Sequence, residues 1–389
     1  MSVPRAAVPP GSLDLDAATQ ATNAWIEVDL GALAANVAAL KGAFGPGVEL
    51  MAVVKANAYG HGVAGVVPTL DTAGVDRLCV ATMAEALALR AAGTDLPILV
   101  MGHSFPGDAA AAVEHDITLT VDCEGLGEAL AAAGRASGYS VPVQVKVDTG
   151  LHRFGVEPER AVTLAEALRR MPGLEVEALW THMANADEAD DSFSDEQQAV
   201  FERVSERLWW IPFRHAANSA TALRRPSMRY NGVRTGLGMY GIVPGNTPDP
   251  GVTPALSVKA RLARVSDVSP GEGVSYGLEW RATRPSRVGL VPVGYGDGWR
   301  RALGNNSDVL VGGRRCPVVG RVCMDHFVID VTDVPGAGTG DVAVLLGAQG
   351  SERITADELA TAAGTISYDI VASLTARLPR FHHRSGVLA

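Results

Sequence analysis

Short apolar runs rich in β-branched residues alternate along residues 49–235 with longer segments rich in alanine, leucine and glutamate. This alternation predicts βα units around a parallel sheet, because strands buried on both faces read as continuous apolar runs. Eight units favour a closed (β/α)8 barrel of the TIM type over an open sheet. The predicted strands are Glu49–Val54, Leu78–Ala81, Pro97–Met101, Ile117–Val121, Val141–Val147, Leu174–Thr181, Ile211–Ala216 and Gly232–Arg234.

Two intervening segments begin with the spacing of a capping box, in which a hydroxyl and a side chain three residues later satisfy free N–H groups at a helix start. These pairs are Thr82 with Glu85 and Ser194 with Gln197. We therefore expect helices to begin at both places.

The segment PGNTPDPGVTP, residues 244–254, is dense in proline and glycine and is typical of a linker. The runs after it are mostly alternating or β-branched with no long helix between them, which predicts a mostly antiparallel β domain. Two short helices are expected from Thr355 and near Ser367. We predict a flexible tail over residues 1–22, the barrel over 23–250 and the β-rich domain over 251–389. The expected β runs are Leu256–Val268, Arg287–Val293, Cys316–Val322, Phe327–Val331 and Asp341–Leu346.

Composition and charge narrow the class of protein. Of 389 residues, 47% are hydrophobic and 20% are charged, which is an ordinary globular balance. The formal net charge of −10 argues against a nucleic-acid or membrane partner, since these favour basic surfaces. The four cysteines form no CxxC pair and no metal-ligand spacing, so we expect reduced thiols, no metal and a cytoplasmic location. The first residues lack the pattern of a secretory signal.

The first predicted strand ends in MAVVKANAYGHG, which places Lys55 where an apolar run meets a glycine-bearing loop. Barrel enzymes hold their active sites at these strand ends. A buried lysine has a lowered pKa, and its neutral amine is a nucleophile toward aldehydes, as a pyridoxal enzyme requires. Tyr59 adds a hydroxyl that could reach a phosphate. The alternatives are a lysine that extends to solvent and a tyrosine that only packs.

Near the eighth strand, NGVRTGLGMYG places Arg234 among three glycines at an expected helix start. Exposed backbone N–H groups there would form an anion site, as in the phosphate loops of barrels, and Ser219 lies at the adjacent position after the seventh strand. An ordinary glycine-rich turn is the alternative.

Three further side chains follow the fifth and sixth strands: Lys146, Arg153 and His182. Isolated cations in loops are mostly solvated. Their convergence with Arg234 on one barrel face would be costly without an anionic ligand. In the second domain, the segments that hold Tyr276 and Met324 could be ordinary β-domain packing, which their periodicity favours.

The motifs AVVKANAYGHG, KVDTGLHRFG, NSAT, VRTGLGMYG, GEGVSYG, GYGDGW, CMDHFVIDV and SYDIVASLTARLPR resemble, in order, the motif series of alanine racemase. The resemblance spans nearly the whole chain after residue 22. It implies a pyridoxal 5'-phosphate barrel plus a β domain, working as a head-to-tail homodimer with shared active sites. The implied reaction interconverts L-alanine and D-alanine by two bases, and so supplies D-alanine for cell-wall peptidoglycan.

The resemblance also assigns roles to individual residues. Lys55 is implied as the Schiff-base lysine and the base for D-alanine, and Tyr276 of the partner subunit as the base for L-alanine. Arg153 and the backbone of Met324 would bind the substrate carboxylate, and Lys146 matches a lysine that is carbamylated in some members. The implied cofactor-binding residues are Lys55, Tyr59, His182, Ser219, Arg234, Gly236, Leu237 and Tyr368.

Simple electrostatics agree with these implied roles. A cationic Arg234 beside the pyridine nitrogen would disfavour its protonation and limit side reactions. Cationic His182 and Arg153 would favour the phenolate of Tyr276. The alternatives are a barrel-type decarboxylase, a racemase of broader specificity and a non-catalytic pyridoxal-phosphate carrier. An arginine near the ring nitrogen argues against a decarboxylase, and the presence of a second domain argues against a non-catalytic carrier.

Overall fold

The computed structural model describes residues 14–389 and divides them into two compact units. The barrel unit contains residues 33–59 and 63–253. The β unit contains residues 14–32, 60–62 and 254–389. Within residues 14–389, no helix combines the length and the apolar character needed to cross a membrane.

Eight parallel strands form the sheet of the barrel unit, which confirms the predicted fold class. Their order is β8-β7-β6-β5-β4-β3-β2-β9. Backbone bonds from Arg234 to Ala217 and from Asn231 to Arg214 join the last strand to β8, so the sheet nearly closes on itself. The strands are β2 (Glu49–Val53), β3 (Arg77–Val80), β4 (Ile98–Val100), β5 (Ile117–Val121), β6 (Val141–Lys146), β7 (Leu174–Trp180), β8 (Phe213–His215) and β9 (Gly232–Thr235).

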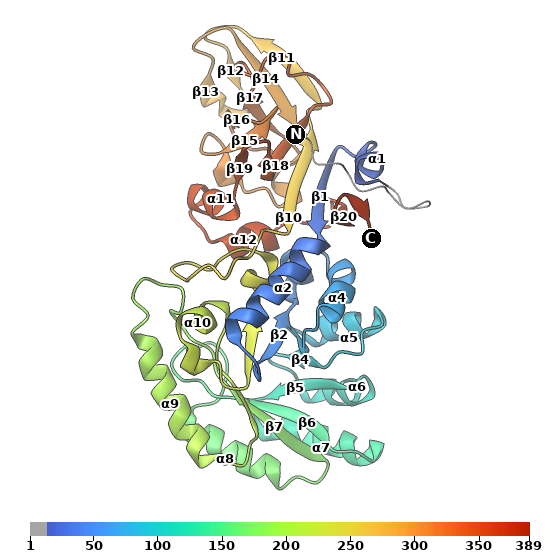
Figure 1. Ribbon diagram of the computed structural model, residues 1–389, viewed down its shortest axis with the longest axis vertical. Helices are drawn as coiled ribbons and strands as arrows, with labels where there is room; N and C mark the ends of the chain where they lie inside the picture. The colour runs from blue at the N-terminus through green and yellow to red at the C-terminus, as the bar shows by residue number, and fades with distance from the viewer. Residues whose placement is uncertain (1–13) are drawn as a thin grey trace. The chain divides into compact units, whose positions relative to one another are not determined.

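Each of the eight predicted runs therefore overlaps a strand. The run from Ile211 yields only a short β8, because Pro212 has no N–H to donate to a ladder. Helices lie outside the strands, as Figure 1 shows for α4 to α9. The helices are α2 (Leu30–Phe44), α3 (Lys55–Tyr59), α4 (Val63–Thr72), α5 (Met83–Ala91), α6 (Ala109–Glu114), α7 (Glu124–Ser137), α8 (Pro158–Arg169), α9 (Phe193–Arg207) and α10 (Ser219–Arg224).

The β unit is mostly antiparallel, as predicted. Its largest sheet runs β16-β15-β18-β10-β1-β20-β21, with β19 beside β18, and smaller sheets contain β11-β14-β17 and β12-β13. The strands are β1 (Ala24–Asp29), β10 (Leu256–Arg261), β11 (Arg264–Val268), β12 (Gly273–Val274), β13 (Trp280–Arg281), β14 (Ser286–Val291), β15 (Asp308–Val311), β16 (Arg314–Pro317), β17 (Phe327–Asp330), β18 (Val342–Gln349), β19 (Glu352–Ile354), β20 (Arg380–Arg384) and β21 (Val387–Leu388).

Two expectations for this unit differ from the structure. The run Leu256–Val268 is two strands in different sheets, because the chain turns between β10 and β11 to bond Asp341 on one side and Leu290 on the other. The run from Cys316 is shorter than expected and lies in β16, which ends at Pro317. The two terminal helices are confirmed as α11 (Ala356–Ala363) and α12 (Ser367–Ala372).

The segment before the barrel also differs from its expected place. We expected residues from 23 onward in the barrel, but β1 pairs antiparallel with β10 and parallel with β20. Of the expected tail, residues 1–13 lie outside the described residues. The next residues form α1 (Leu15–Thr19), where the Asp14 side chain accepts the N–H of Asp16 and Leu15 is buried.

Candidate active site

Lys55 stands at the carboxyl end of β2 and is half-buried. The four residues after it, Ala56 to Tyr59, all have φ between 52° and 55°. This left-handed turn costs roughly 1–2 kcal/mol per residue for side chains with a Cβ. Such strain in a loop at a strand end is typical of functional sites. The turn therefore distinguishes the surroundings of Lys55 from those of an ordinary strand end.

Arg234 of β9 is 2% exposed and is held by backbone and imidazole groups. Its two terminal nitrogens donate to the carbonyls of Thr181, His215 and Ala216, at 2.7, 3.2 and 2.9 Å. Burial lowers the pKa of Arg234 to about 10, so the guanidinium stays charged at neutral pH. Among residues 14–389, its Nε–H has no hydrogen-bond acceptor. One donor thus remains for a ligand.

Two histidines contact the same guanidinium. Nδ1 of His215 lies 2.6 Å from Nη1 of Arg234, and Nδ1 of His182 lies 3.2 Å from Nη2. Burial, followed by the charge of Arg234, lowers the pKa of both imidazoles well below the usual range. The expectation of a cationic His182 is therefore wrong. The ring accepts from a buried cation and remains neutral.

Lys146, at the end of β6, is 3% exposed. Its ammonium nitrogen lies 5.0 Å from the ring centre of Phe154 and 4.8 Å from that of Trp180. The guanidinium of Arg234 also lies 4.8 Å from the Trp180 ring. Burial, and then the charges of Arg153 and Arg234, lower the pKa of Lys146 to about 7. This amine is thus partly neutral at physiological pH.

The cations of this face lack carboxylate partners. Burial first, and then Arg153, lowers the pKa of Lys55 below its usual value. Arg153 itself is exposed on the loop after β6. Within the described part of the chain, none of Lys55, Lys146, Arg153 and Arg234 forms an ion pair. The predicted convergence of cations is present, except that His182 is uncharged, and an anionic ligand would relieve their repulsion.

The predicted anion site lies beside these cations. The N–H of Gly236 donates to the hydroxyl of Ser219 at 3.2 Å, and a short 3-10 helix, Leu237–Tyr240, begins directly after this glycine. A Cβ at position 236 would lie 2.6 Å from the Tyr59 hydroxyl. Glycine at this position thus lets the Tyr59 hydroxyl approach the backbone closely. The three groups that the sequence singled out for a phosphate are therefore neighbours.

The remaining predicted residues belong to the β unit. Tyr276 and Met324 are 71% and 54% exposed, which is unusual for large apolar side chains. The Met324 carbonyl accepts the N–H of Gly296 at 2.8 Å. Tyr368 is half-buried in α12. Neither Tyr276 nor Met324 packs into the core of its own unit.

Sequence reasoning missed the polar residues behind Arg234. Nε2 of His215 contacts Oε1 of Gln144 at 2.9 Å, and Nε2 of Gln144 donates to Glu177 at 2.6 Å. Glu177 also pairs with Arg77 at 2.7 Å. Gln144 and Glu177 interrupt the apolar strands β6 and β7. A polar residue within a buried strand was the available signal.

The loop after β7 reveals another residue that was misinterpreted. The capping box at Thr82 and Glu85 is confirmed, but the one at Ser194 and Gln197 is wrong because α9 begins earlier, at Phe193. Gln197 is buried and instead binds the loop backbone: its amide accepts from Ala184 and donates to His182. It also donates to the Thr149 hydroxyl at 3.0 Å. Gln197 thus ties the ends of β6 and β7 together.

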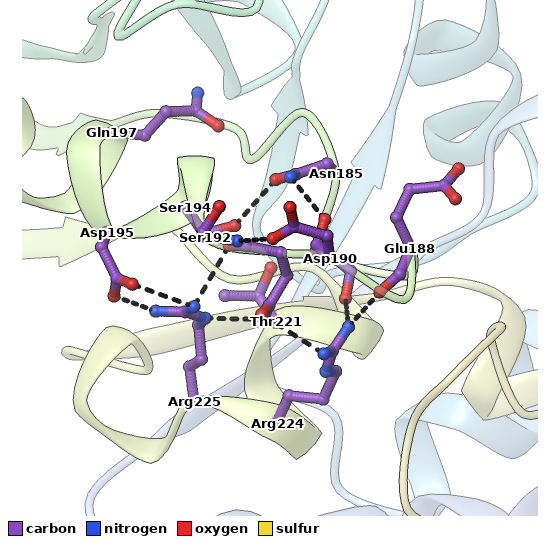
Figure 2. Close-up of polar contacts among 12 residues, drawn as sticks. Asn185, Glu188, Asp190, Ser192, Ser194, Asp195, Gln197, Thr221, Arg224 and Arg225 are labelled. Carbon is purple, nitrogen blue, oxygen red and sulfur yellow. Dashed lines mark hydrogen bonds and ion pairs between the residues drawn. The ribbon is translucent and has the colours of Figure 1, made fainter.

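Ion pairs hold the outer part of the same loop. Figure 2 shows Arg224, the last residue of α10, and Arg225, directly after the helix, reaching toward residues 185–195. Arg225 contacts Asp191 at 2.8 Å and also pairs with Asp195. Arg224 donates to the carbonyl of Glu188 at 2.6 Å. Helix α10 therefore supports the loop that carries His182.

Two family models match this chain: the alanine racemase N-terminal domain over residues 28–244 and the alanine racemase C-terminal domain over 255–382. The alanine racemase of Geobacillus kaustophilus is 42% identical over 376 residues, which cover 93% of this chain and 94% of that protein. That of Halothermothrix orenii is 40% identical over 366 residues, covering 92% and 96%. The crystal structure of alanine racemase from Bacillus anthracis with bound L-Ala-P has a TM-score of 0.87 at 37% identity, covering 94% and 97%. The chain belongs to the alanine racemase family and is thus an isomerase.

Proposed function

We propose that this enzyme interconverts L-alanine and D-alanine with pyridoxal 5'-phosphate held by Lys55 and with a second copy of the chain completing each active site. The observation that supports the proposal most strongly is the cluster of Lys55, Lys146, Arg153 and Arg234, which lacks carboxylate partners within residues 14–389. An anionic cofactor and the carboxylate of an amino acid would both offset this charge.

The residues present fit this cofactor. The phosphate would be held by Tyr59, Ser219, and the backbone of Gly236 and Leu237, with Tyr368 completing its surroundings. The fit rests on the close approach of the Tyr59 hydroxyl to Gly236. The remaining Nε–H of Arg234 would face the ring nitrogen, with His182 beside it. Because arginine stays charged, it disfavours a proton on that nitrogen, unlike the carboxylate partners of other pyridoxal enzymes.

Bound here, pyridoxal phosphate supplies an electron sink for negative charge at the α-carbon of the substrate. The amine of Lys55, with its lowered pKa, is suited both to hold the cofactor aldehyde covalently and to accept the α-proton of D-alanine. Arg153 would bind the substrate carboxylate, aided by the backbone of Met324 of the partner subunit. Tyr276 of the partner subunit would act on L-alanine from the opposite face.

The homodimer is supported by the surface of the β unit. The two residues assigned to a neighbouring site, Tyr276 and Met324, are among its most exposed large side chains. A second copy would cover them and place the phenol opposite Lys55. Each active site would then contain residues of two chains.

We further propose that Lys146 carries a carbamate. Its amine is buried among aromatic rings, and a pKa of about 7 leaves a large neutral fraction to attack carbon dioxide. The N–H proton would leave to solvent as the carbamate forms. The new anion would reduce the crowding of positive charge and help to orient Arg153.

In the cell, the reaction would supply D-alanine for peptidoglycan, and the cytoplasm is the proposed compartment. All four cysteines are free thiols, as a reducing compartment would maintain them.

The first test is chiral chromatography of alanine incubated with the enzyme and pyridoxal phosphate. Wild type should yield both enantiomers from either one. Lys55→Ala should lose the reaction and the visible absorbance of the protein-bound cofactor, whereas Lys41→Ala, at a lysine on α2 outside the site, should keep both. Cofactor absorbance that survives dialysis in Lys55→Ala would place the covalent link elsewhere.

A mixing experiment tests the shared site. Lys55→Ala and Tyr276→Phe chains should each be inactive alone, while exchanged subunits should recover one intact site per mixed dimer. No recovery despite proven subunit exchange would mean that each site is built from one chain.

A further inference from the structure

The carboxylate of Glu85 connects two βα units at the carboxyl ends of their strands. Its Oε2 accepts the N–H groups of Ala81 and Thr82, at 2.8 and 3.2 Å, and the Thr82 hydroxyl accepts the N–H of Glu85 at 3.3 Å. These bonds complete the capping box of α5. The other oxygen, Oε1, accepts the N–H of Ala56 at 2.7 Å. A capping box alone does not require this last bond.

Ala56 is the first residue of the left-handed turn, directly after Lys55. Within the chain's own loop, the turn is held by the bond from the Ala58 N–H to Val54 at 2.9 Å. Asn57 also accepts the N–H of Val63 at 2.9 Å. Neither bond uses the N–H of Ala56. The N–H of Ala56 donates to the Glu85 carboxylate, which belongs to the next βα segment of the barrel.

We propose that Glu85 is a positioning residue for Lys55: its carboxylate fixes the peptide after the lysine to the rigid start of α5 and so maintains the strained turn that presents the amine. The proposal rests on the assignment of Lys55 as the cofactor lysine. Strain of several residues persists only where surrounding contacts over-determine it. A charge-assisted bond to a carboxylate is about twice as strong as a neutral one and suits this task.

The charge of Glu85 has a second effect on the same amine. Arg153 and Arg234 act on Lys55 as cations, Lys146 is partly neutral, and His182 is a neutral ring. Burial and the two arginines lower the pKa of Lys55, and the carboxylate of Glu85 opposes them by raising it. Removing the carboxylate should therefore lower the pKa of Lys55 further.

Hydrogen–deuterium exchange of the full chain without added cofactor tests the positioning role directly. In Glu85→Ala, backbone amides of residues 54–60 should exchange about 10-fold faster or more, as expected for a lost hydrogen bond to a charged group. The matched control is Thr82→Ala, which removes the hydroxyl of the capping box but leaves the Ala56 bond. It should speed exchange in the first turn of α5 and leave residues 54–60 as in wild type.

A second readout is the rate at which each protein captures pyridoxal phosphate, followed by absorbance from pH 6 to pH 10. Glu85→Ala should capture it more slowly at its best pH, with a lower pH midpoint, and Thr82→Ala should match wild type. Equal effects of the two variants on residues 54–60 and on capture would overturn the proposal and reduce Glu85 to a helix cap. Unchanged exchange at residues 54–60 in Glu85→Ala would overturn it as well.

If Glu85→Ala does not fold, Glu85→Gln provides the test. An amide has one acceptor oxygen, so it cannot accept both from Ala56 and from the start of α5. Exchange should then rise at residues 54–60 or at 81–83, and the pH midpoint of capture should fall. No change in either segment would overturn the proposal. Failure of wild type to capture the cofactor at Lys55 would instead contradict the proposed function, since the exchange comparison needs no cofactor.

Discussion

Nη1 of Arg234 lies 2.6 Å from Nδ1 of His215, and this contact determines where the imidazole holds its proton. Arginine can only donate, so Nδ1 must accept and the proton lies on Nε2. That Nε2–H then donates to Oε1 of Gln144 at 2.9 Å, which in turn directs the Gln144 amide toward Glu177. The cation proposed to face the cofactor ring is thus oriented through hydrogen-bonded side chains of β8, β6 and β7.

His215→Phe should therefore destabilise the protein, because it leaves one donor of Arg234 and the acceptor oxygen of Gln144 buried without partners. The expected loss is about 1–3 kcal/mol in the free energy of unfolding, measured by urea denaturation. His152→Gln is the control, since His152 is 86% exposed and should change stability by less than about 0.5 kcal/mol. Equal stability of His215→Phe and wild type would show that the contacts of the His215 ring with Arg234 and Gln144 contribute no net stability.

Stability should rise with pH through the range in which Lys146 titrates. The folded pKa is about 7, below the unfolded value of about 10.4, so between these values the unfolded chain binds more protons. The penalty for burying Lys146 is full below pH 7 and disappears as pH approaches 10.4.

Urea titrations from pH 7 to pH 10 in buffer free of carbon dioxide check this sign. Wild type should gain stability relative to Lys146→Met, by up to about 1.4 kcal/mol per pH unit. Lys55 contributes a similar slope to both proteins, so the difference reports Lys146. Parallel curves for the two proteins would contradict a lowered pKa.

Each of the two proposed bases should act on one enantiomer of alanine, Lys55 on D-alanine and Tyr276 on L-alanine. Tyr276→Phe removes a hydroxyl but little volume, so racemisation should fall about 10²–10⁴-fold in both directions. In deuterium oxide, Lys55 should still exchange the α-hydrogen of D-alanine, while L-alanine stays largely unlabelled. Nuclear magnetic resonance of the recovered enantiomers measures this asymmetry. Equal labelling of both would leave one base, or a water in place of the phenol, serving both faces.

The loop after β7 should loosen when its ion pairs are removed. Arg225 is mostly buried between Asp191 and Asp195, so Arg225→Met should raise the exchange of amides in residues 183–192 about 5-fold or more. Arg207→Met removes an ion pair with Glu159 on the exposed surface and should leave this loop unchanged. A loop equally protected in both variants would mean that the ion pairs of Arg225 do not hold it.

Much of the fold follows from local patterns that can be read along the chain. Each barrel strand overlaps a predicted apolar run, and the capping box at Thr82 forms as its spacing predicts. The sequence also singles out Lys55, Tyr59, Ser219 and Arg234 as candidates, because each lies at or shortly after the end of a predicted strand. Burial of both sheet faces and the geometry of a helix start constrain residues that are close together in the sequence. Both can therefore be predicted from local residue patterns.

Partnerships between distant segments required the tertiary structure. Strand β1 pairs with strands more than two hundred residues away, Gln197 binds the loop before its own helix instead of capping it, and Glu85 reaches across to Ala56. The charge state of His182 depends likewise on burial beside Arg234. The same side chain has several compatible partners in a linear chain. Which one it meets is decided when the strands pair and the interior loses its water, because only then does an unsatisfied donor or an unpaired charge become costly.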